Sequence, residues 1–270
     1  MRLVSIMRFI ENKVNGVTFM TAPVIRARHG FSTRYGGVSE GIYSSLNLAV
    51  SRGDDPAAVD ENYRRLTGAV GVDGGAIALT KQVHGNTVRV VTGPDAALRD
   101  PARPECDGLV TARRGLTLFC FTADCVPVLL CDAENGVIAA VHCGWRSSVS
   151  DILGAAVEKM TELGAAAESI CAAIGPAIGA CCFEVGPEVP EAAERLLGGG
   201  LGELCREKSG HAGKYLLDLR GVNRRRLLQL GLRPENVCVS GECTMCSPDK
   251  YWSHRATQGR RGCQAALICL

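Results

Sequence analysis

A cysteine interrupts one strongly apolar run of this 270-residue chain, and a histidine ends the next. Cys125 interrupts the apolar run 116–131, and His142 closes the apolar run 136–142. The polar residues 132–135 between these runs predict a turn, and therefore a hairpin of two buried strands. Because opposed residues of a hairpin lie about 5 Å apart, Cys125 and His142 should come close together at one end of it. A thiol beside an imidazole is either a nucleophile with its base or a pair of metal ligands.

His84 is a third candidate ligand, and the glycine that follows it, Gly85, permits a positive φ or a close approach of the main chain. Together His84, Cys125 and His142 offer two nitrogens and one sulfur, a donor set that suits Zn²⁺. Three protein ligands leave a fourth position open, as in catalytic zinc sites. A metal there activates a water molecule or polarises a substrate oxygen. The alternative is a buried cysteine with two structural histidines.

A second motif, Cys243-Thr244-Met245-Cys246, has the local spacing of a zinc site. A structural site needs two further ligands, and neither a second CxxC nor an HxxxH follows, although His254 could be a third ligand. A thioredoxin-like redox role would need the motif at the start of a helix after a strand. We favour a structural role without metal over these two, and the role of the pair stays open. We expect the adjacent Cys181 and Cys182 to be core or loop thiols.

Several arginines could bind an anion, because a guanidinium matches phosphate or carboxylate geometry. Arg34 lies in a Gly/Ser-rich loop, and Arg146 follows the His142 segment directly. Arg255, Arg260 and Arg261 cluster near the end of the chain. Arg146 is the strongest of these candidates because of its place beside His142.

Strands and helices that must position these residues alternate without strict βαβ regularity. The expected strands are 17–25, 116–131 with a break near Pro127, 136–142, 169–174, 236–240 and 264–270. The expected helices are 55–68, 148–164, 187–197 and 222–230, the first with Asp55 as its N-cap and Pro56 at N1. We predict one α/β or α+β domain over residues 16–270, with mixed β-sheets packed together and flanking helices, preceded by an extension over residues 1–15.

Composition excludes several classes of protein. Hydrophobic residues make up 46% of the chain, which is enough to bury a core and argues against disorder. The net charge is only +2, so we expect no nucleic-acid partner. We find neither an export signal nor an apolar run of membrane-spanning length, so we expect no membrane and a cytoplasmic protein with reduced thiols. Most of its 14 cysteines should then be small hydrophobic residues of the core.

Nine short motifs follow one another along the chain: FSTR (31–34), GGVS (36–39), SLNL (45–48), QVHG (82–85), TADCVPV (122–128), VHCGWR (141–146), GPAIG (175–179), FEVG (183–186) and DL (218–219). In this order they resemble the laccase-domain family. Its members are called multicopper polyphenol oxidases, zinc-dependent purine nucleoside phosphorylases or peptidoglycan editing factors. The chain has Cys143 where the family usually has alanine and Ser147 where it usually has glycine, and neither is a proposed ligand.

The resemblance implies a compact fold of packed sheets and a zinc site made of His84, Cys125 and His142, with copper as a substitute. It implies phosphorolysis of adenosine, inosine and S-methyl-5'-thioadenosine, with deamination of adenosine as a further activity. Purine nucleosides and phosphate would be the partners, and the oligomeric state, monomer or dimer, stays open.

The roles that the resemblance assigns are as follows. Cys125, Asp124 and Arg146 would be catalytic, with Asp124 as a proton shuttle. Arg146 or Arg34 would hold the phosphate. Arg34, Asn47 and Gln82, which lie in its motifs, would bind substrate.

Three other functions remain open at this point. Cys125 and His142 could form a metal-free hydrolase, although such an enzyme has no need of His84. The arginine-rich loops could bind the diphosphate of a cell-wall precursor, as in an editing hydrolase. A closed zinc site without a cavity would indicate a regulator that is not an enzyme. A laccase is disfavoured, because a multicopper cluster consumes more histidines than the five present here.

Overall fold

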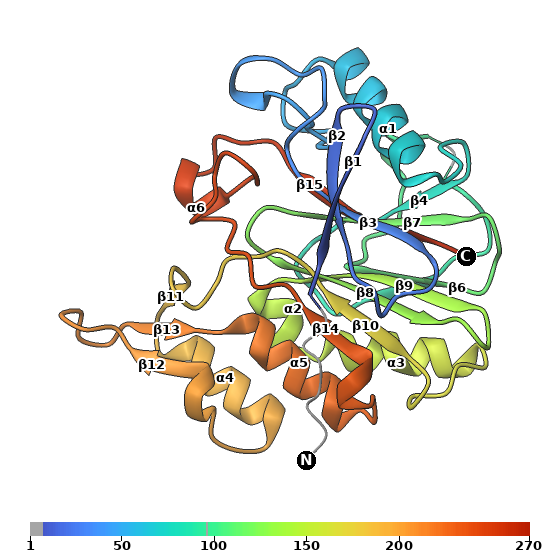
Figure 1. Cartoon of the computed structure of the whole chain (residues 1–270). Helices are drawn as coiled ribbons and strands as arrows, with labels where there is room; N and C mark the ends of the chain where they lie inside the picture. Colours follow the sequence, from blue (N-terminus) through green and yellow to red (C-terminus); the bar gives the residue numbers. More distant parts are fainter. Residues whose placement is uncertain (1–7, 96) are drawn as a thin grey trace.

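Two six-stranded sheets pack face to face at the centre of the molecule (Figure 1). The computed structural model describes residues 8–95 and 97–270. The first sheet has the order β1 (Ile10–Val14), β2 (Val17–Thr21), β3 (Arg28–Ser32), β15 (Gln264–Cys269), β7 (Thr117–Thr122) and β4 (Ile77–Leu79). The second has the order β14 (Val237–Val239), β10 (Cys171–Ile174), β8 (Val126–Asp132), β9 (Val137–Cys143), β6 (Gly108–Thr111) and β5 (Val88–Val90). A small third sheet has the order β11 (Glu184–Val185), β13 (Tyr215–Leu217) and β12 (Cys205–Glu207).

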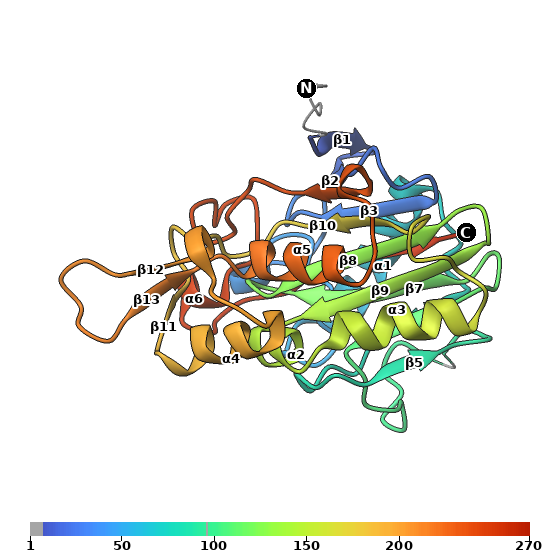
Figure 2. The ribbon, with the colours of Figure 1, turned by 90° about the horizontal axis from the view of Figure 1, so that it is seen from below.

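Helices cover the outer faces of both sheets, which gives four layers (Figure 1). Helix α1 (Pro56–Val70) packs on the first sheet. On the second sheet lie α2 (Trp145–Val149), α3 (Ile152–Glu162), α4 (Glu188–Leu197) and α5 (Leu219–Gln229), seen in front of the strands in Figure 2. The remaining helical segments are α6 (His254–Thr257) and the 3-10 turns η1 (Gly41–Tyr43), η2 (Gly202–Leu204) and η3 (Pro234–Asn236). The predicted single domain of mixed sheets with flanking helices is confirmed.

The central strands β8 and β9 are buried on both faces. In β8, Val128 and Leu130 face the helices, whereas Leu129 and Cys131 face the first sheet. Alternate residues of a strand point to opposite faces, so a strand between two apolar layers must be apolar throughout. This is why the central part of the sequence reads as continuous apolar runs.

The predicted central hairpin is confirmed. Strands β8 and β9 pair antiparallel, with Pro127 opposite His142. The buried carboxylate of Asp132 holds the turn between them, since it accepts hydrogen bonds from the main chain of Asn135 and Ala166 and from the hydroxyl of Ser169. The register of this hairpin brings the start of β8 and the end of β9 to the same edge.

Several boundaries differ from expectation. The predicted extension 1–15 contains β1, which pairs with β2, while residues 1–7 lie outside the described part. The predicted helix 148–164 is two helices, because Asp151 adopts a left-handed φ of 61° and caps the second of them through the N–H of Gly154. The predicted cap of the first helix is confirmed, with Asp55 accepting from Ala57.

The described residues contain no disulfide, and seven of the 14 cysteines are buried. Those seven are Cys106, Cys120, Cys131, Cys143, Cys238, Cys243 and Cys269. Among residues 8–95 and 97–270, no helix combines the length and the apolar character that crossing a membrane requires.

Candidate functional site

The structure brings His84, Cys125 and His142 together at one end of the central hairpin. His84 lies in the loop between β4 and β5, Cys125 directly precedes β8, and His142 belongs to β9. Their ligand atoms all lie within 4.8 Å of one another, and Cys125 Sγ is 4.0 Å from His84 Nε2. We call these three residues the His–Cys–His cluster.

Gly144 makes room for this cluster. A Cβ added at this position would lie 2.9 Å from Cδ2 of His84, 3.4 Å from Sγ of Cys125 and 3.5 Å from Cε1 of His142. The side chains therefore converge on space that any larger residue would fill. One thiolate and two imidazoles around such a space fit the donor preference of Zn²⁺.

Asp107 holds two of the three candidate ligands in place, and the sequence did not single it out. Its Oδ1 accepts from Nδ1 of His142 at 2.7 Å and from the N–H of His84 at 3.0 Å. Its Oδ2 accepts from the N–H groups of Val83 and Gly85 at 3.0 and 2.9 Å. Three successive N–H groups thus converge on one buried carboxylate, which explains the left-handed φ of 62° at His84.

The bond to Asp107 also sets the tautomer of His142. Because Nδ1 keeps its proton for Asp107, Nε2 is the nitrogen that would lose its proton and bind a metal, as in many metal-bound histidines. The only trace of this role in the sequence is an acidic residue that directly precedes the buried strand β6.

The cluster favours the thiolate form of Cys125. Burial raises the pKa of Cys125, but the charge of His142 and hydrogen bonds from His142 and His84 outweigh burial and lower the pKa to about 6. Burial lowers the pKa of His142, yet the Cys125 thiolate and Asp107 raise it to about 9. A thiolate is the form required of a metal ligand and of a nucleophile.

A cavity of about 280 Å³ opens beside the cluster. His84 and Cys125 line it together with the apolar side chains of Trp145, Phe183 and Ile178. Ala123 and Leu219 add further apolar surface, and the charged or polar part of the lining consists of Arg52, Asp124, His254, Arg255 and Arg261. Apolar walls with a few charged groups are typical of a small-molecule site.

Asp124 lines the cavity with both carboxylate oxygens already engaged. Oδ1 accepts from the hydroxyl of Thr244 at 2.7 Å, and Oδ2 accepts from the N–H of Arg255 at 2.6 Å. Its main chain has a φ of 86°, and its carbonyl accepts from the N–H of Ile178. These contacts favour a positioning role for Asp124 beside Cys125.

Arg146 and Arg34 lie outside the cavity lining. The exposed guanidinium of Arg146 stacks 4.2 Å above the ring of Trp145. That of Arg34 stacks 4.0 Å above Trp252 and donates to the carbonyls of Ser44 and Pro248. The cations that reach the cavity are instead Arg52 and two of the C-terminal candidates, Arg255 and Arg261, whereas the third candidate, Arg260, is not in its lining.

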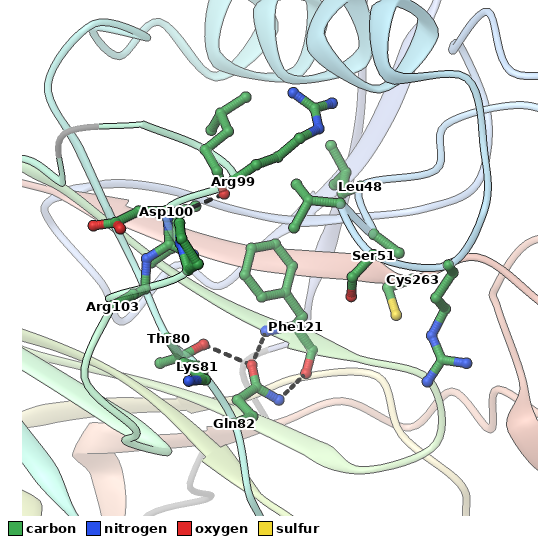
Figure 3. Close-up of a pocket in the computed structure, with 16 residues that line it drawn as sticks. Leu48, Ser51, Thr80, Lys81, Gln82, Arg99, Asp100, Arg103, Phe121 and Cys263 are labelled. Atoms are coloured by element: carbon green, nitrogen blue, oxygen red, sulfur yellow. Dashed lines mark hydrogen bonds between the residues drawn. The ribbon is translucent and has the colours of Figure 1, made fainter.

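Asn47 and Gln82 hold the main chain of the surrounding loops. The buried amide of Asn47 donates to Asp54 and accepts from the N–H of Cys263. Gln82 lines a second cavity, of about 430 Å³, that shares Arg52 with the first. There the amide of Gln82 pairs with the N–H and carbonyl of Phe121 and accepts from the Thr80 hydroxyl (Figure 3).

A family model described as multi-copper polyphenol oxidoreductase laccase matches residues 28–270 of the chain. The chain belongs to the laccase-domain family. A purine nucleoside phosphorylase of Deinococcus radiodurans is 41% identical over 255 residues, which cover 94% of each chain.

Two crystal structures of family members share the fold. YlmD from Geobacillus stearothermophilus superposes with a TM-score of 0.89 at 33% identity, covering 97% of this chain and 98% of its own. YfiH from Bacillus licheniformis superposes with a TM-score of 0.88 at 28% identity, and the match covers 95% of this chain and 97% of YfiH. The names of the curated relatives support an enzyme. In the structure two groups of cysteine and histidine side chains, one of them the His–Cys–His cluster, are close enough together to hold a metal.

Proposed function

We propose that this protein is a zinc-dependent purine nucleoside phosphorylase that acts on adenosine, inosine and S-methyl-5'-thioadenosine and also deaminates adenosine. The observation that carries the proposal is the His–Cys–His cluster at the wall of a cavity that combines aromatic and cationic side chains. Relatives that are 41% and 35% identical over more than nine-tenths of this chain are named purine nucleoside phosphorylase. The cytoplasm is our proposed location.

In this proposal His84, Cys125 and His142 hold the zinc ion. When bound, the metal supplies an electrophilic centre with one position open to water or substrate. Copper is an alternative occupant because the thiolate is soft, but the five histidines are too few for a multicopper oxidase site.

The chain's own residues would bind and orient the nucleoside and phosphate. The rings of Trp145 and Phe183 offer apolar surfaces for a purine base. Arg255 and Arg261 place positive charge on the same cavity, which suits the phosphate that phosphorolysis requires. We assign the phosphate to these two arginines before Arg146, because the Arg146 guanidinium is exposed on Trp145.

For Asp124 we propose that it holds Cys125 and the main chain of Arg255 in place. Each of its oxygens already accepts a hydrogen bond, so a role as proton shuttle requires one of these bonds to break. A loss of rate with an unchanged pH profile in Asp124→Asn supports positioning, whereas loss of one limb of the profile supports proton transfer.

A metal-free cysteine hydrolase is the second candidate, and one observation favours it. Asp107 orients His142 beside a thiol whose pKa is lowered to about 6, the arrangement of a nucleophile, base and orienting acid. His84 has no role in such an enzyme. We therefore rank the metal-free hydrolase below the zinc enzyme.

One assay separates the two candidates. The purified full chain is stripped with a chelator, divided, and half is reloaded with zinc. Each half receives adenosine with and without phosphate, and adenine, inosine and hypoxanthine are measured. Adenine that appears only with both zinc and phosphate supports the phosphorylase, and inosine without phosphate supports the deaminase.

Turnover in the stripped half contradicts the zinc requirement. Cys125→Ala and His142→Ala should both be inactive, whereas Cys205→Ser, which alters a half-buried thiol of β12, should keep activity. Phosphorolysis by either cluster variant would contradict the assignment of the site.

A further inference from the structure

Four cysteines from two distant segments converge outside the His–Cys–His cluster. Cys181 and Cys182 follow the turn after β10, and Cys243 and Cys246 lie in the loop after β14. Their sulfurs all lie within 4.8 Å of one another. Cys246 Sγ is 3.5 Å from Cys181 Sγ and 3.4 Å from Cys182 Sγ, and all four are free thiols. We call these residues the cysteine tetrad.

The topology of the second sheet explains why the two cysteine-bearing loops lie side by side. Strands β10 and β14 pair in parallel, with Ile174 opposite Val239, so the chain leaves both strands at the same edge. The pairing continues beyond the strands, where Ala177 forms a bridge with Cys243. The two ligands that the CxxC motif lacked in the sequence therefore come from about sixty residues earlier. Of the two expected places for Cys181 and Cys182, core or loop, the structure shows the loop.

We propose that the cysteine tetrad binds one zinc ion as a structural site, independent of the His–Cys–His cluster. Four thiolates at Zn–S distances of about 2.3 Å place their sulfurs about 3.8 Å apart, which matches the spacing of the tetrad. A polynuclear iron–sulfur cluster holds its cysteine sulfurs farther apart, because several metal ions lie between them. Four protein ligands leave no open position, so this metal would stabilise the fold.

The surroundings of the tetrad suit the negative charge of four thiolates. The N–H of Gly179 donates to Sγ of Cys243 at 3.2 Å. A Cβ at Gly179 would lie 3.1 Å from Nη2 of Arg220 and 3.2 Å from Sγ of Cys181, so the guanidinium borders the sulfurs. The buried Nε of Arg220 has no hydrogen-bond partner among the described residues. A zinc ion with four thiolates carries a net charge of −2, which this cation and this N–H would partly offset.

The tetrad also connects the two loops that support the cavity wall. The N–H of Thr244 donates to the carbonyl of Ala177, and its hydroxyl donates to Asp124. Ile178, which follows Ala177 in the chain, lines the cavity, and its N–H donates to the carbonyl of Asp124. A metal in the tetrad would therefore fix the loops on which Asp124 rests. Binding releases the thiol protons and transfers no electrons.

Metal stoichiometry tests the proposal. The full chain is prepared under reducing conditions with added zinc, freed of unbound metal, and analysed for zinc per chain. We expect two equivalents in the wild type and in Cys205→Ser, and one each in Cys246→Ser and in Cys125→Ser. One equivalent in the wild type that survives in Cys246→Ser would overturn the proposal.

A spectroscopic measurement keeps the test valid if Cys246→Ser does not fold. X-ray absorption at the zinc edge of Cys125→Ser reports only the remaining metal, and we expect four sulfurs at about 2.3 Å. Nitrogen or oxygen ligands in that spectrum, or a Cys182–Cys246 disulfide in freshly reduced, zinc-treated protein, would overturn it. Because Cys125→Ser has lost the proposed active-site ligand, this outcome does not depend on the proposed enzymatic activity.

Discussion

Replacing Asp107 by asparagine tests how the metal cluster is held together. The substitution keeps the size of the side chain but turns one of its two acceptor oxygens into an NH₂ donor. Each oxygen of Asp107 accepts two hydrogen bonds, so neither orientation of the amide satisfies all four donors.

The two orientations damage the cluster in different ways. With NH₂ in the place of Oδ2, the N–H groups of Val83 and Gly85 lose their acceptor, and the loop that carries His84 is released. With NH₂ in the place of Oδ1, His142 must accept at Nδ1, which moves its proton to Nε2, the nitrogen proposed to bind the metal.

The expected losses of stability and of zinc affinity follow from these lost hydrogen bonds. Hydrogen bonds to a charged group contribute about 1.5–3 kcal/mol each, so losing two lowers the unfolding free energy of the metal-free protein by roughly 3–6 kcal/mol. Removing a group that orients a metal ligand weakens metal binding by about 10- to 100-fold. Zinc affinity is measured by competition with a chromophoric chelator, and stability by urea denaturation of the metal-free protein.

Asp132→Asn is the matched control, because Asp132 is an equally buried carboxylate that accepts main-chain N–H groups at the other end of the hairpin. It should lose stability while its zinc affinity stays within about twofold of wild type, since it touches no ligand. An Asp107→Asn variant that binds zinc as tightly as this control would refute the assigned role of Asp107.

Three further predictions concern the glycine, the arginines and the pH dependence of stability. Gly144→Ala places a Cβ 2.9 Å from the ring of His84 and should weaken zinc binding roughly tenfold or more, whereas Gly68→Ala, with no atom within 4 Å, should leave zinc titrations unchanged. Arg255→Gln should raise the KM for phosphate about tenfold and Arg146→Gln much less, as steady-state kinetics would show; the reverse order would return the phosphate to Arg146. Burial raises the pKa of Asp132, but hydrogen bonds from Asn135, Ser169 and Ala166 outweigh it and hold the pKa below its ordinary value. The stabilisation by Asp132 is therefore present above the ordinary pKa and is lost as the pH falls through the lowered one. Urea denaturation over this pH range should show the difference between wild type and Asp132→Asn shrinking with acidification, and a constant difference would contradict the assignment.

The sequence by itself determined those parts of the site that depend on local geometry. A short polar turn between two apolar runs specifies an antiparallel hairpin, so the approach of Cys125 to His142 could be predicted from spacing alone. Asp55 was predictable as a helix cap for the same reason, because its partner, the N–H of Ala57, is two residues away. The family was also evident from the order of the motifs.

Other features depended on where long-range pairing placed each segment. Arg146 follows His142 closely in the chain, yet helix α2 directs its guanidinium onto Trp145, while Arg255 and Arg261 reach the cavity from the far end of the chain. Adjacency in sequence does not determine the direction of a side chain once a strand passes into a helix.

Asp107 and the cysteine tetrad show most clearly that spacing along the sequence does not predict contacts between distant segments. Asp107 has no recognisable spacing from His84 or His142, and its role arises because β6 pairs with β9. The tetrad exists because β10 and β14 are parallel neighbours, so that two loops sixty residues apart leave one edge of the sheet together. Spacing along the chain determines contacts within a hairpin or a helix, whereas the order of strands in a sheet determines which distant segments meet, and only the tertiary structure decides that order.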